Sequence, residues 1–531
     1  MILPAALAVI LSTFLALSCC SAGEAAAPSL RRFSLLSRSS PYDPATFRAS
    51  TAGNPRTWLE IFRRDTRSFV ARAAQQDPQR AACFSGAWER ILDELLLQGG
   101  MGLNCVVLCR LREECLRAAG FDDIFASVKQ EENAEALRLL PSVLQYLDEE
   151  DLKWVAEDPA QREGPSAASE RARERLRRAI CGVFAGNIFD LGASASIERF
   201  EQQKEVDRSS SSSIAKGEQQ AAGSPPPKGP PKGFVATSQW VRRRSLAVDD
   251  MDAFLQRALC ENKKDKKNEE GNGGVPSPAL RYRKVLIFVD NCGADVVCGV
   301  LPLVRDLFLA EGAADSDHGE LEVVLCANER PAINDVTAGE LRGLLQELVA
   351  ATAAAATSES GSNSTSNSTT SDDSMMAESE GVALLAGKVS SGRLRVCSTG
   401  TDMPVIDLRR VSGALNDEAT APVVCQEGGN EGGEGEKLVI LEGMGRGIET
   451  NLRARLAVDC LNLGMVKHQE VAELLGHGAQ LYDSVCCFKP GTGEQVVGRG
   501  GEEEKGHEMG AARLPWRRVI GDWRDIPDGG L

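Results

Sequence analysis

The stretch KVLIFVDNCGAD, residues 284–295, decides how the second half of this sequence folds. It opens as a short, nearly continuous run of Val, Leu, Ile and Phe, which is typical of a strand buried on both faces of a sheet. It then reaches the polar pair Asp290 and Asn291. In open parallel sheets, ligands bind beyond the carboxyl ends of the strands. We therefore expect a buried strand that delivers two oxygen-bearing side chains to a binding site.

The same alternation of strand and helix continues to residue 476. Similar apolar runs occupy four further stretches, at residues 321–327, 394–399, 437–443 and 463–468. Stretches with helical spacing lie between and after them, at residues 295–312, 336–356, 450–461 and 469–476. This repetition predicts an α/β fold with a mainly parallel, Rossmann-like sheet covered by helices.

An all-helical N-terminal subdomain is expected before the α/β domain, because residues 57–200 carry apolar side chains at three- and four-residue spacing. The α/β domain is expected to span residues 234–489. Blocks rich in Ser, Pro, Gly or charge cannot bury a core, so they read as low-complexity inserts or extensions. These blocks are residues 203–233, 261–280, 351–383 and 426–436, and a C-terminal extension, 490–531, to which the sequence assigns no role.

The overall composition argues against two kinds of protein. The 531 residues carry 60 Lys and Arg against 76 Asp and Glu, a net charge of -16, whereas nucleic-acid binding needs cations to neutralise phosphates. The 16 cysteines form no C-x-x-C pair and only four histidines accompany them, so no zinc site is expected. Most of these cysteines lie in apolar runs, which indicates buried free thiols and a reducing compartment.

Residues 1–50 read as a targeting segment in two parts. Residues 1–20 hold no charge and contain an apolar stretch of signal-peptide length, too short for a membrane span. Residues 28–56 are rich in Arg, Ser and Thr, as transit peptides are. This order favours an organelle, a plastid above all, reached through the secretory route; the secretory pathway itself and the cytoplasm are the alternatives. No stable membrane span is expected in the mature chain.

The ends of two neighbouring strands offer ligands for a divalent cation. Asp290 and Asn291 end the first strand, and the loop after the second carries Asn334 and Asp335. Carboxylate and amide oxygens are ligands for Mg²⁺ or Mn²⁺, although softer divalent ions also accept them. Alone, Asp335 would be read as a helix N-cap. Beside the other strand end, it is expected to be a third oxygen ligand.

The fourth strand ends in Glu442-Gly-Met-Gly-Arg-Gly, and a helix is expected from about residue 449. Glycines at such a place let backbone N–H groups approach an anion. A tight turn, or a dinucleotide or adenosylmethionine site, are alternatives. The latter would need an acidic residue about 20 positions on, where the sequence has Lys467 and His468 instead. Arg446 and Lys467 together are cations that could bind the phosphate of an ester. A metal ion would assist the hydrolysis of this ester.

Five stretches together resemble the metal-dependent damage-control phosphatases. They are FVDNCGADVVCGVLPLVRDL (288–307), ANERPAINDVT (327–337), STGTDMPVIDLRRVS (398–412), LVILEGMGRGIETNL (438–452) and GMVKHQEVAELLGHG (464–478). The Glu-Gly-Met-Gly-Arg sequence at 442–446 is similar to the signature of the subfamily that acts on phosphopantetheine. The resemblance implies hydrolysis of 4'-phosphopantetheine, or of its oxidised or damaged forms. Another small phosphomonoester, such as a sugar phosphate, and a non-catalytic sensor of coenzyme A intermediates are the alternatives.

The resemblance also implies roles for particular residues. Asp290, Asn291 and Asp335 match the metal ligands of the family, with Mn, Co, Ni or Mg as the ion, and Lys467 matches a lysine of a sister subfamily. Asp290, Lys467 and Glu442 are the expected catalytic groups, with Glu442 as a base or an orienting group. The phosphate is expected to bind to a larger set, which is Gly443, Met444, Gly445, Arg446, Lys467, Asn187 and Asp190. Asn187 and Asp190 belong to a Gly-Asn-x-x-Asp run and have an alternative role as helix-end caps. The oligomeric state stays open.

Overall fold

The structure is a computed structural model of the chain. The residues that it describes are 30–44, 56–97, 103–157, 165–188, 233–261, 278–311, 320–359, 379–422, 436–476 and 478–494. The expected inserts at 203–233 and 426–436 lie almost wholly outside these residues, as does the C-terminal extension beyond residue 494.

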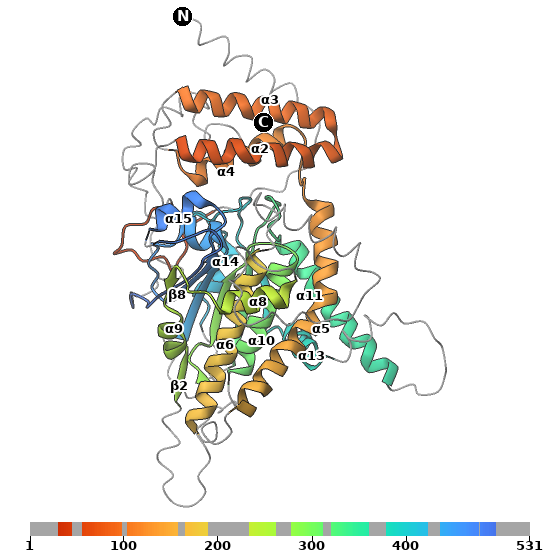
Figure 1. The fold of residues 1–531 in the computed structure, drawn as a ribbon, viewed down its shortest axis with the longest axis vertical. Helices are drawn as coiled ribbons and strands as arrows, with labels where there is room; N and C mark the ends of the chain where they lie inside the picture. The colour runs from red at the N-terminus through yellow and green to blue at the C-terminus, as the bar shows by residue number, and fades with distance from the viewer. Residues whose placement is uncertain are drawn as a thin grey trace, which may run out of the picture.

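A seven-stranded sheet forms the centre of the molecule, and the α/β fold with a mainly parallel sheet is confirmed (Figure 1). Its order from edge to edge is β1 (Val248–Asp249), β9 (Ser484–Lys489), β8 (Asp459–Met465), β7 (Lys437–Glu442), β4 (Lys284–Phe288), β5 (Glu322–Ala327) and β6 (Leu394–Ser398). The five strands from β8 to β6 run parallel, whereas β9 pairs antiparallel with β8. A separate hairpin, β2 (Leu259–Glu261) with β3 (Pro278–Leu280), flanks an insert.

The order of these strands reverses between β4 and β7. After β4 the chain builds β5 and β6 on one side, then crosses to build β7 and β8 on the other. In doubly wound sheets a ligand crevice forms at such a switch point, outside the carboxyl ends of the strands. Asp290 follows β4 and Glu442 ends β7, so both lie at this point.

Helices cover one face of the sheet. The hydrophobic core on this face is formed by sheet residues such as Ile287 and Leu325 together with residues of the covering helices. These helices are α5 (Ala126–Glu157), α6 (Pro165–Ile188), α8 (Phe234–Arg242), α9 (Met251–Ala258), the π-helix η2 (Asp295–Val300), α10 (Leu301–Leu309), α11 (Ala338–Glu359) and α13 (Glu380–Ser390). None of the helices in the described ranges is long and apolar enough to cross a lipid bilayer.

The opposite face is covered by one short helix and by residues 30–44. Helix α14 (Gly413–Thr420) supplies Leu415, and the N-terminal segment supplies Phe33, which is fully buried and packs edge to face on Phe288 with ring centroids 5.7 Å apart. The expectation that all of residues 1–50 form a targeting segment is therefore wrong for residues 30–44, which belong to the folded core. These residues fold onto the sheet because the burial of their apolar side chains is favourable, although their composition resembles that of a transit peptide.

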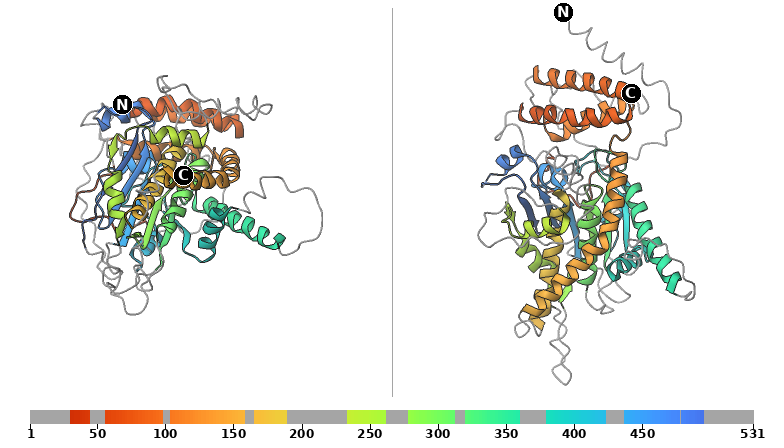
Figure 2. Two further views of the ribbon diagram at one scale, coloured as in Figure 1. Left: turned by 60° about the horizontal axis from the view of Figure 1, so that its bottom comes forward. Right: turned by 45° about the vertical axis from the view of Figure 1, so that its right-hand side comes forward.

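The expected all-helical subdomain is divided between two places. Helices α2 (Arg56–Gln76), α3 (Pro78–Leu97) and α4 (Cys105–Ala118) form a separate layer at one end of the molecule, seen in Figure 1 and in the right view of Figure 2. We call these three helices the cap. Their core includes Met444, Ile448 and Val466, so the cap packs over the carboxyl end of the sheet. Helices α5 and α6 instead pack on the sheet face.

Several element boundaries differ from expectation. The helix expected from about residue 449, over 450–461, is displaced toward the N-terminus and is short: after β7 the chain forms the π-helix η4 (Met444–Thr450). Asp459, Cys460 and Leu461 belong instead to the buried strand β8, which starts four residues before the predicted one. The inserts at 261–280 and 351–383 have ordered ends, in the β2–β3 hairpin and in α11 and α13. Helix α15 (Gln469–Leu475) agrees with the sequence.

Candidate active site

Asp290 and Glu442 are joined directly at the switch point. The backbone N–H of Asp290 donates to Glu442 Oε2 at 2.8 Å, across the ends of adjacent strands. Both residues are at most 5% exposed. Because both oxygens of Glu442 accept hydrogen bonds, the second from Asn187, the geometry favours an orienting role for this carboxylate over that of a free base.

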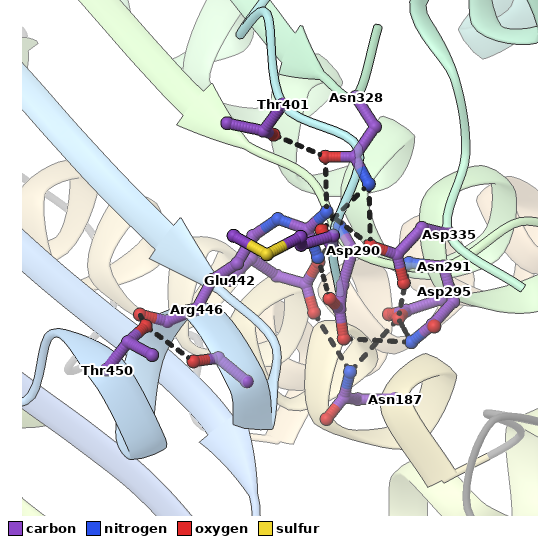
Figure 3. Close-up of polar contacts among 12 residues, drawn as sticks. Asn187, Asp290, Asn291, Asp295, Asn328, Asp335, Thr401, Glu442, Arg446 and Thr450 are labelled. Carbon is purple, nitrogen blue, oxygen red and sulfur yellow. Dashed lines mark hydrogen bonds and ion pairs between the residues drawn. The ribbon is translucent and has the colours of Figure 1, made fainter. Parts of the chain in front are cut away.

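Asn187 holds two of the acids in place. Its Nδ2 donates to Asp295 Oδ2 and to Glu442 Oε1, each at 3.0 Å (Figure 3). Its Oδ1 accepts from Met465 N at 3.3 Å. Helix α6 can approach Asp295 this closely because the residue before Asn187 is Gly186. A Cβ at position 186 would lie 2.9 Å from Asp295 Cα. Asn187 therefore faces the site. The other member of the motif, Asp190, lies outside the described residues.

Three carboxylates form a cluster that could hold a cation. Asp290, Asp295 and Glu442 each offer an oxygen within 4.8 Å of the others, and all three are buried. Burial, reinforced by the charge of Asp290, raises the pKa of Asp295 to about 7. Burial, with the charges of Asp295 and Asp290, likewise holds the pKa of Glu442 well above its usual value. The cluster therefore gains from a nearby positive charge.

Arg446 joins two of the expected metal ligands. Its Nη2 lies 2.6 Å from Asp335 Oδ2 and 3.1 Å from Asn328 Oδ1, and its Nη1 pairs with Asp290 Oδ1 (Figure 3). Burial opposes the charge of the guanidinium, but the carboxylates of Asp335 and Asp290 raise its pKa above the ordinary value. Asn328 is held in turn by the hydroxyl of Thr401, which donates to its Oδ1 at 2.9 Å.

Asn291 has an oxygen that fits a metal ion. Its Nδ2 donates to Asp295 Oδ2 at 2.8 Å and to Asp290 Oδ2 at 3.0 Å, whereas its buried Oδ1 accepts no hydrogen bond from the described residues. Asn291 and Asp335 also form an isolated backbone bridge, so the loops after β4 and β5 lie side by side. A buried amide oxygen among carboxylates has the donor chemistry that a hard divalent cation needs.

The glycines after β7 serve close packing more than anion binding. This corrects the expectation that their backbone N–H groups approach an anion. The N–H of Gly443 donates to Leu463 O at 2.9 Å and that of Gly447 to Gly443 O at 2.8 Å, so neither is available to a phosphate. A Cβ on Gly443 would lie 2.2 Å from Asp290 Cγ, and one on Gly445 2.4 Å from Pro404 O. Only glycine lets the turn approach the acid so closely.

Lys467, from the loop after β8, and Met444, from η4, complete the site. The backbone N–H of Lys467 lies 3.2 Å from Met444 Sδ, and the lysine is 2% exposed. Its positive charge lowers the pKa of Asp295 and of Glu442, against the larger effect of burial. The site thus sets two cations, Arg446 and Lys467, against four buried carboxylates, which are Asp290, Asp295, Asp335 and Glu442.

Two site residues were missed by the sequence interpretation. Asn328 follows β5 in register with Asp290 after β4, so the strand-end rule that selected Asp290 would have found it. Asp295 lies one turn of helix after Asn291, and no pattern separates it from a helix-capping acid. Its role depends on α6 crossing over it, which brings Asn187 within hydrogen-bonding distance.

A doubly wound sheet with buried carboxylates, an arginine and a lysine at its switch point defines an α/β enzyme that acts on phosphate esters. Comparison with known proteins names the family. Residues 48–222 and 232–481 match the damage-control phosphatase ARMT1-like domain, so the chain belongs to this family and is a phosphatase.

Individual relatives agree with this assignment. The chain is 33% identical over 447 residues to a damage-control phosphatase of Arabidopsis thaliana, covering 82% of this chain and 88% of that one. It is 32% identical to Arabidopsis thaliana pantothenate kinase 2, over 87% of this chain and 42% of that protein. It is 27% identical to the mouse 4'-phosphopantetheine phosphatase, over 82% of this chain and 45% of that protein.

One solved structure is also similar. A DUF89 family protein from Pyrococcus horikoshii is 14% identical, with a TM-score of 0.42, over 81% of this chain and 96% of that one.

Proposed function

We propose that this phosphatase hydrolyses 4'-phosphopantetheine, or its oxidised or damaged forms, to the dephosphorylated pantetheine and phosphate, with a divalent metal ion. The observation that carries the proposal is the buried group of four carboxylates beside Arg446 and Lys467 at the strand ends. Its substrate is supported by the Glu-Gly-Met-Gly-Arg sequence at 442–446 and by the mouse relative of that name.

The proposed metal site centres on Asp290. Asn291 and Asp335 are the ligands that the sequence suggests, and this set is supported by Asn291 Oδ1, which accepts no hydrogen bond from the described part of the chain. Asp295 and Glu442 offer further oxygens beside Asp290. A bound Mn, Co, Ni or Mg ion would polarise the phosphoryl group and lower the pKa of a bound water. The excess of carboxylates over cations in the site favours such an ion.

The residues of the chain itself would bind and orient the ester. Arg446 presents a planar fork of donors that suits phosphate oxygens, and Lys467 adds a second positive charge. In this proposal Asp290 and Asp335 would hold the metal ion, and the guanidinium of Arg446, which now pairs with both carboxylates, would offer N–H donors to the phosphate. Asn187 fixes Glu442, and Glu442 fixes the backbone of Asp290. The cap packs over this end of the sheet, where it would limit the access of water to the reacting group.

The test is phosphate release from 4'-phosphopantetheine by the chain with residues 30–44 intact, with Mn, Co, Ni or Mg supplied in turn after chelation. Asp290→Asn is the matched control, since it keeps the shape and removes one charge. Metal-dependent release that the control loses supports the proposal. Release from a sugar phosphate panel but not from 4'-phosphopantetheine would support the alternative, the same chemistry on another small phosphomonoester.

We also propose that the N-terminus directs the chain to an organelle, with a plastid favoured. Residues 1–29 lie outside the described residues, and residues 30–44 are part of the core. Any removable targeting segment would therefore end before residue 30. Fluorescence microscopy of a fusion to the first 29 residues, with N-terminal sequencing of the mature protein, tests both points.

A further inference from the structure

Asn334 is a buried amide that no described residue satisfies. Its side chain is fully buried, and neither Nδ2 nor Oδ1 has a hydrogen-bond partner among the described residues. It is the only buried asparagine in the described part of the chain of which both polar atoms lack a partner; Asn291 lacks one for its oxygen alone. An unpaired buried amide is costly in free energy, and native proteins rarely keep one without a ligand or another partner.

The backbone places Asn334 between the site and the cap. It lies in a tight turn closed by a hydrogen bond from Asp335 N to Ala332 O at 3.1 Å, and its carbonyl accepts from Cys292 N at 3.0 Å. The turn holds Ile333 at a φ of 45°, an unfavourable conformation for a β-branched residue. Strain of this kind persists where the surrounding structure requires it, and it often accompanies binding sites.

A pocket adjoins the same turn. Residues 331–333 line it from one side, and α4 with residues 121–125 line it from the other. Asp335, the next residue after Asn334, contacts Arg446. In the chain, Asn334 therefore lies between Ile333, which lines this pocket under the cap, and Asp335, which contacts the arginine that we assign to the phosphate.

The chemistry of the Asn334 amide limits the kinds of ligand that could satisfy it. A metal ion would satisfy only Oδ1, and a fully ionised phosphate would satisfy only Nδ2. A neutral group that both donates and accepts, an amide or a hydroxyl, satisfies both atoms. We propose that Asn334 binds an amide or hydroxyl in the organic part of the phosphate ester, next to the phosphate.

The proposal rests on the proposed function and deepens it. In 4'-phosphopantetheine a hydroxyl and an amide lie a few bonds from the phosphate, so both are within reach of a residue beside the phosphate site. Sites built to hydrogen-bond such groups discriminate strongly against esters that lack them. Asn334 is then a specificity-determining residue.

The experiment compares Asn334→Leu with the wild type on two esters, 4'-phosphopantetheine and p-nitrophenyl phosphate, which has no hydroxyl or amide. We expect kcat/KM for the first to fall by about tenfold or more and that for the second by less than about twofold. The melting temperature of the substrate-free protein should stay or rise, because leucine removes an unpaired amide at similar volume. An equal loss on both esters, or a lower melting temperature with no selective loss, would overturn the proposal.

A matched control is Asn462→Leu. Asn462 is equally buried, but its Nδ2 donates to Gly447 O at 2.8 Å and to Asn451 O at 3.2 Å. This variant should melt at a lower temperature, which shows that the assay detects the loss of a satisfied amide. Asn334→Ser replaces the first variant if that does not fold, and the same selective loss is expected.

The failure of the two proposals can be told apart. If the wild type does not hydrolyse 4'-phosphopantetheine, the proposed function fails, and ribose 5-phosphate takes its place as the hydroxyl-bearing ester. Selective loss on that ester in Asn334→Leu would still support the role of Asn334. No selective loss on whichever hydroxyl- or amide-bearing ester the wild type uses would refute it.

Discussion

Arg446 Nη2 lies 2.6 Å from Asp335 Oδ2 while Nη1 pairs with Asp290, so one guanidinium ties together the chain segments that follow β4, β5 and β7. All three residues are at most 5% exposed. At such burial, the removal of one partner leaves charges without compensation. The metal-free site therefore depends on this arginine.

Arg446→Met should destabilise the metal-free protein by about 3–5 kcal/mol, because it leaves two buried carboxylates without their cation. Urea unfolding in the presence of a chelator measures this. Arg63→Met is the control, since Arg63 pairs with Asp93 at 2.6 Å with side chains 41% and 62% exposed, and such pairs contribute at most about 1 kcal/mol. Equal effects of the two variants would contradict the arrangement.

Gly443→Ala should lower activity by about 100-fold and weaken metal binding, because the new Cβ would displace the carboxylate of Asp290. Phosphate release and calorimetric titration with Mn²⁺ measure the two effects. Gly392→Ala shares the positive φ, 74° against 94°, but has open space around its Cβ. The control should lose only stability, about 1–3 kcal/mol from backbone strain. Normal Mn²⁺ binding by Gly443→Ala would count against the close approach.

Removal of residues 1–29 should leave the melting temperature and activity unchanged, whereas removal of residues 1–50 should abolish both. The longer deletion takes away Phe33, Leu35 and Leu36, which are buried against the sheet, and Tyr42, whose hydroxyl donates to Asn451 Oδ1 at 2.8 Å. Thermal unfolding and phosphate release measure the outcome.

Within the full chain, Phe33→Ala should cost about 3–5 kcal/mol, as expected for a large buried aromatic residue. A stable, active chain that begins at residue 51 would show that residues 30–44 are dispensable.

Asn187→Leu should reduce kcat by roughly 10- to 100-fold, as the loss of groups that orient metal ligands does. The leucine leaves Asp295 Oδ2 and Glu442 Oε1 without the amide that now donates to both. Steady-state kinetics and Mn²⁺ titration measure the change. If Asn187 only capped its helix, stability would fall while the affinity for Mn²⁺ stayed the same.

Glu418 should give the protein stability that disappears in acid. A hydrogen bond from Arg395 lowers the pKa of Glu418, so folding favours its ionised form. Its contribution is fully present above the unfolded pKa of about 4.3 and is lost as the pH falls through the lower folded pKa. The wild type should therefore be more stable than Glu418→Gln at pH 7, with a smaller difference near pH 3, in urea unfolding at each pH. A difference that grows in acid would contradict this assignment.

Much of the α/β half followed from local pattern. Buried parallel strands are continuous apolar runs, so residues 284–290 and 437–443 were recognisable as strands that end in polar side chains. Because parallel strands present their carboxyl ends at one edge, Asp290, Asn291, Asp335 and Glu442 were expected together from sequence alone, and the structure places them together. Periodicity misplaced the helix at 450–461, because strand β8 is buried throughout, Asp459 and Asn462 included, and its sequence carries no strict alternation.

Tertiary structure alone decided the contacts between distant segments. No local pattern indicates that Asn187 on α6 reaches Asp295 and Glu442, or that Arg446 lies between Asp290 and Asp335. The same holds for residues 30–44, whose composition resembles a transit peptide but whose apolar side chains complete a sheet face with little helical cover. Composition and spacing report what a segment can form by itself. Burial against a partner far along the chain determines where it packs and which charges it meets.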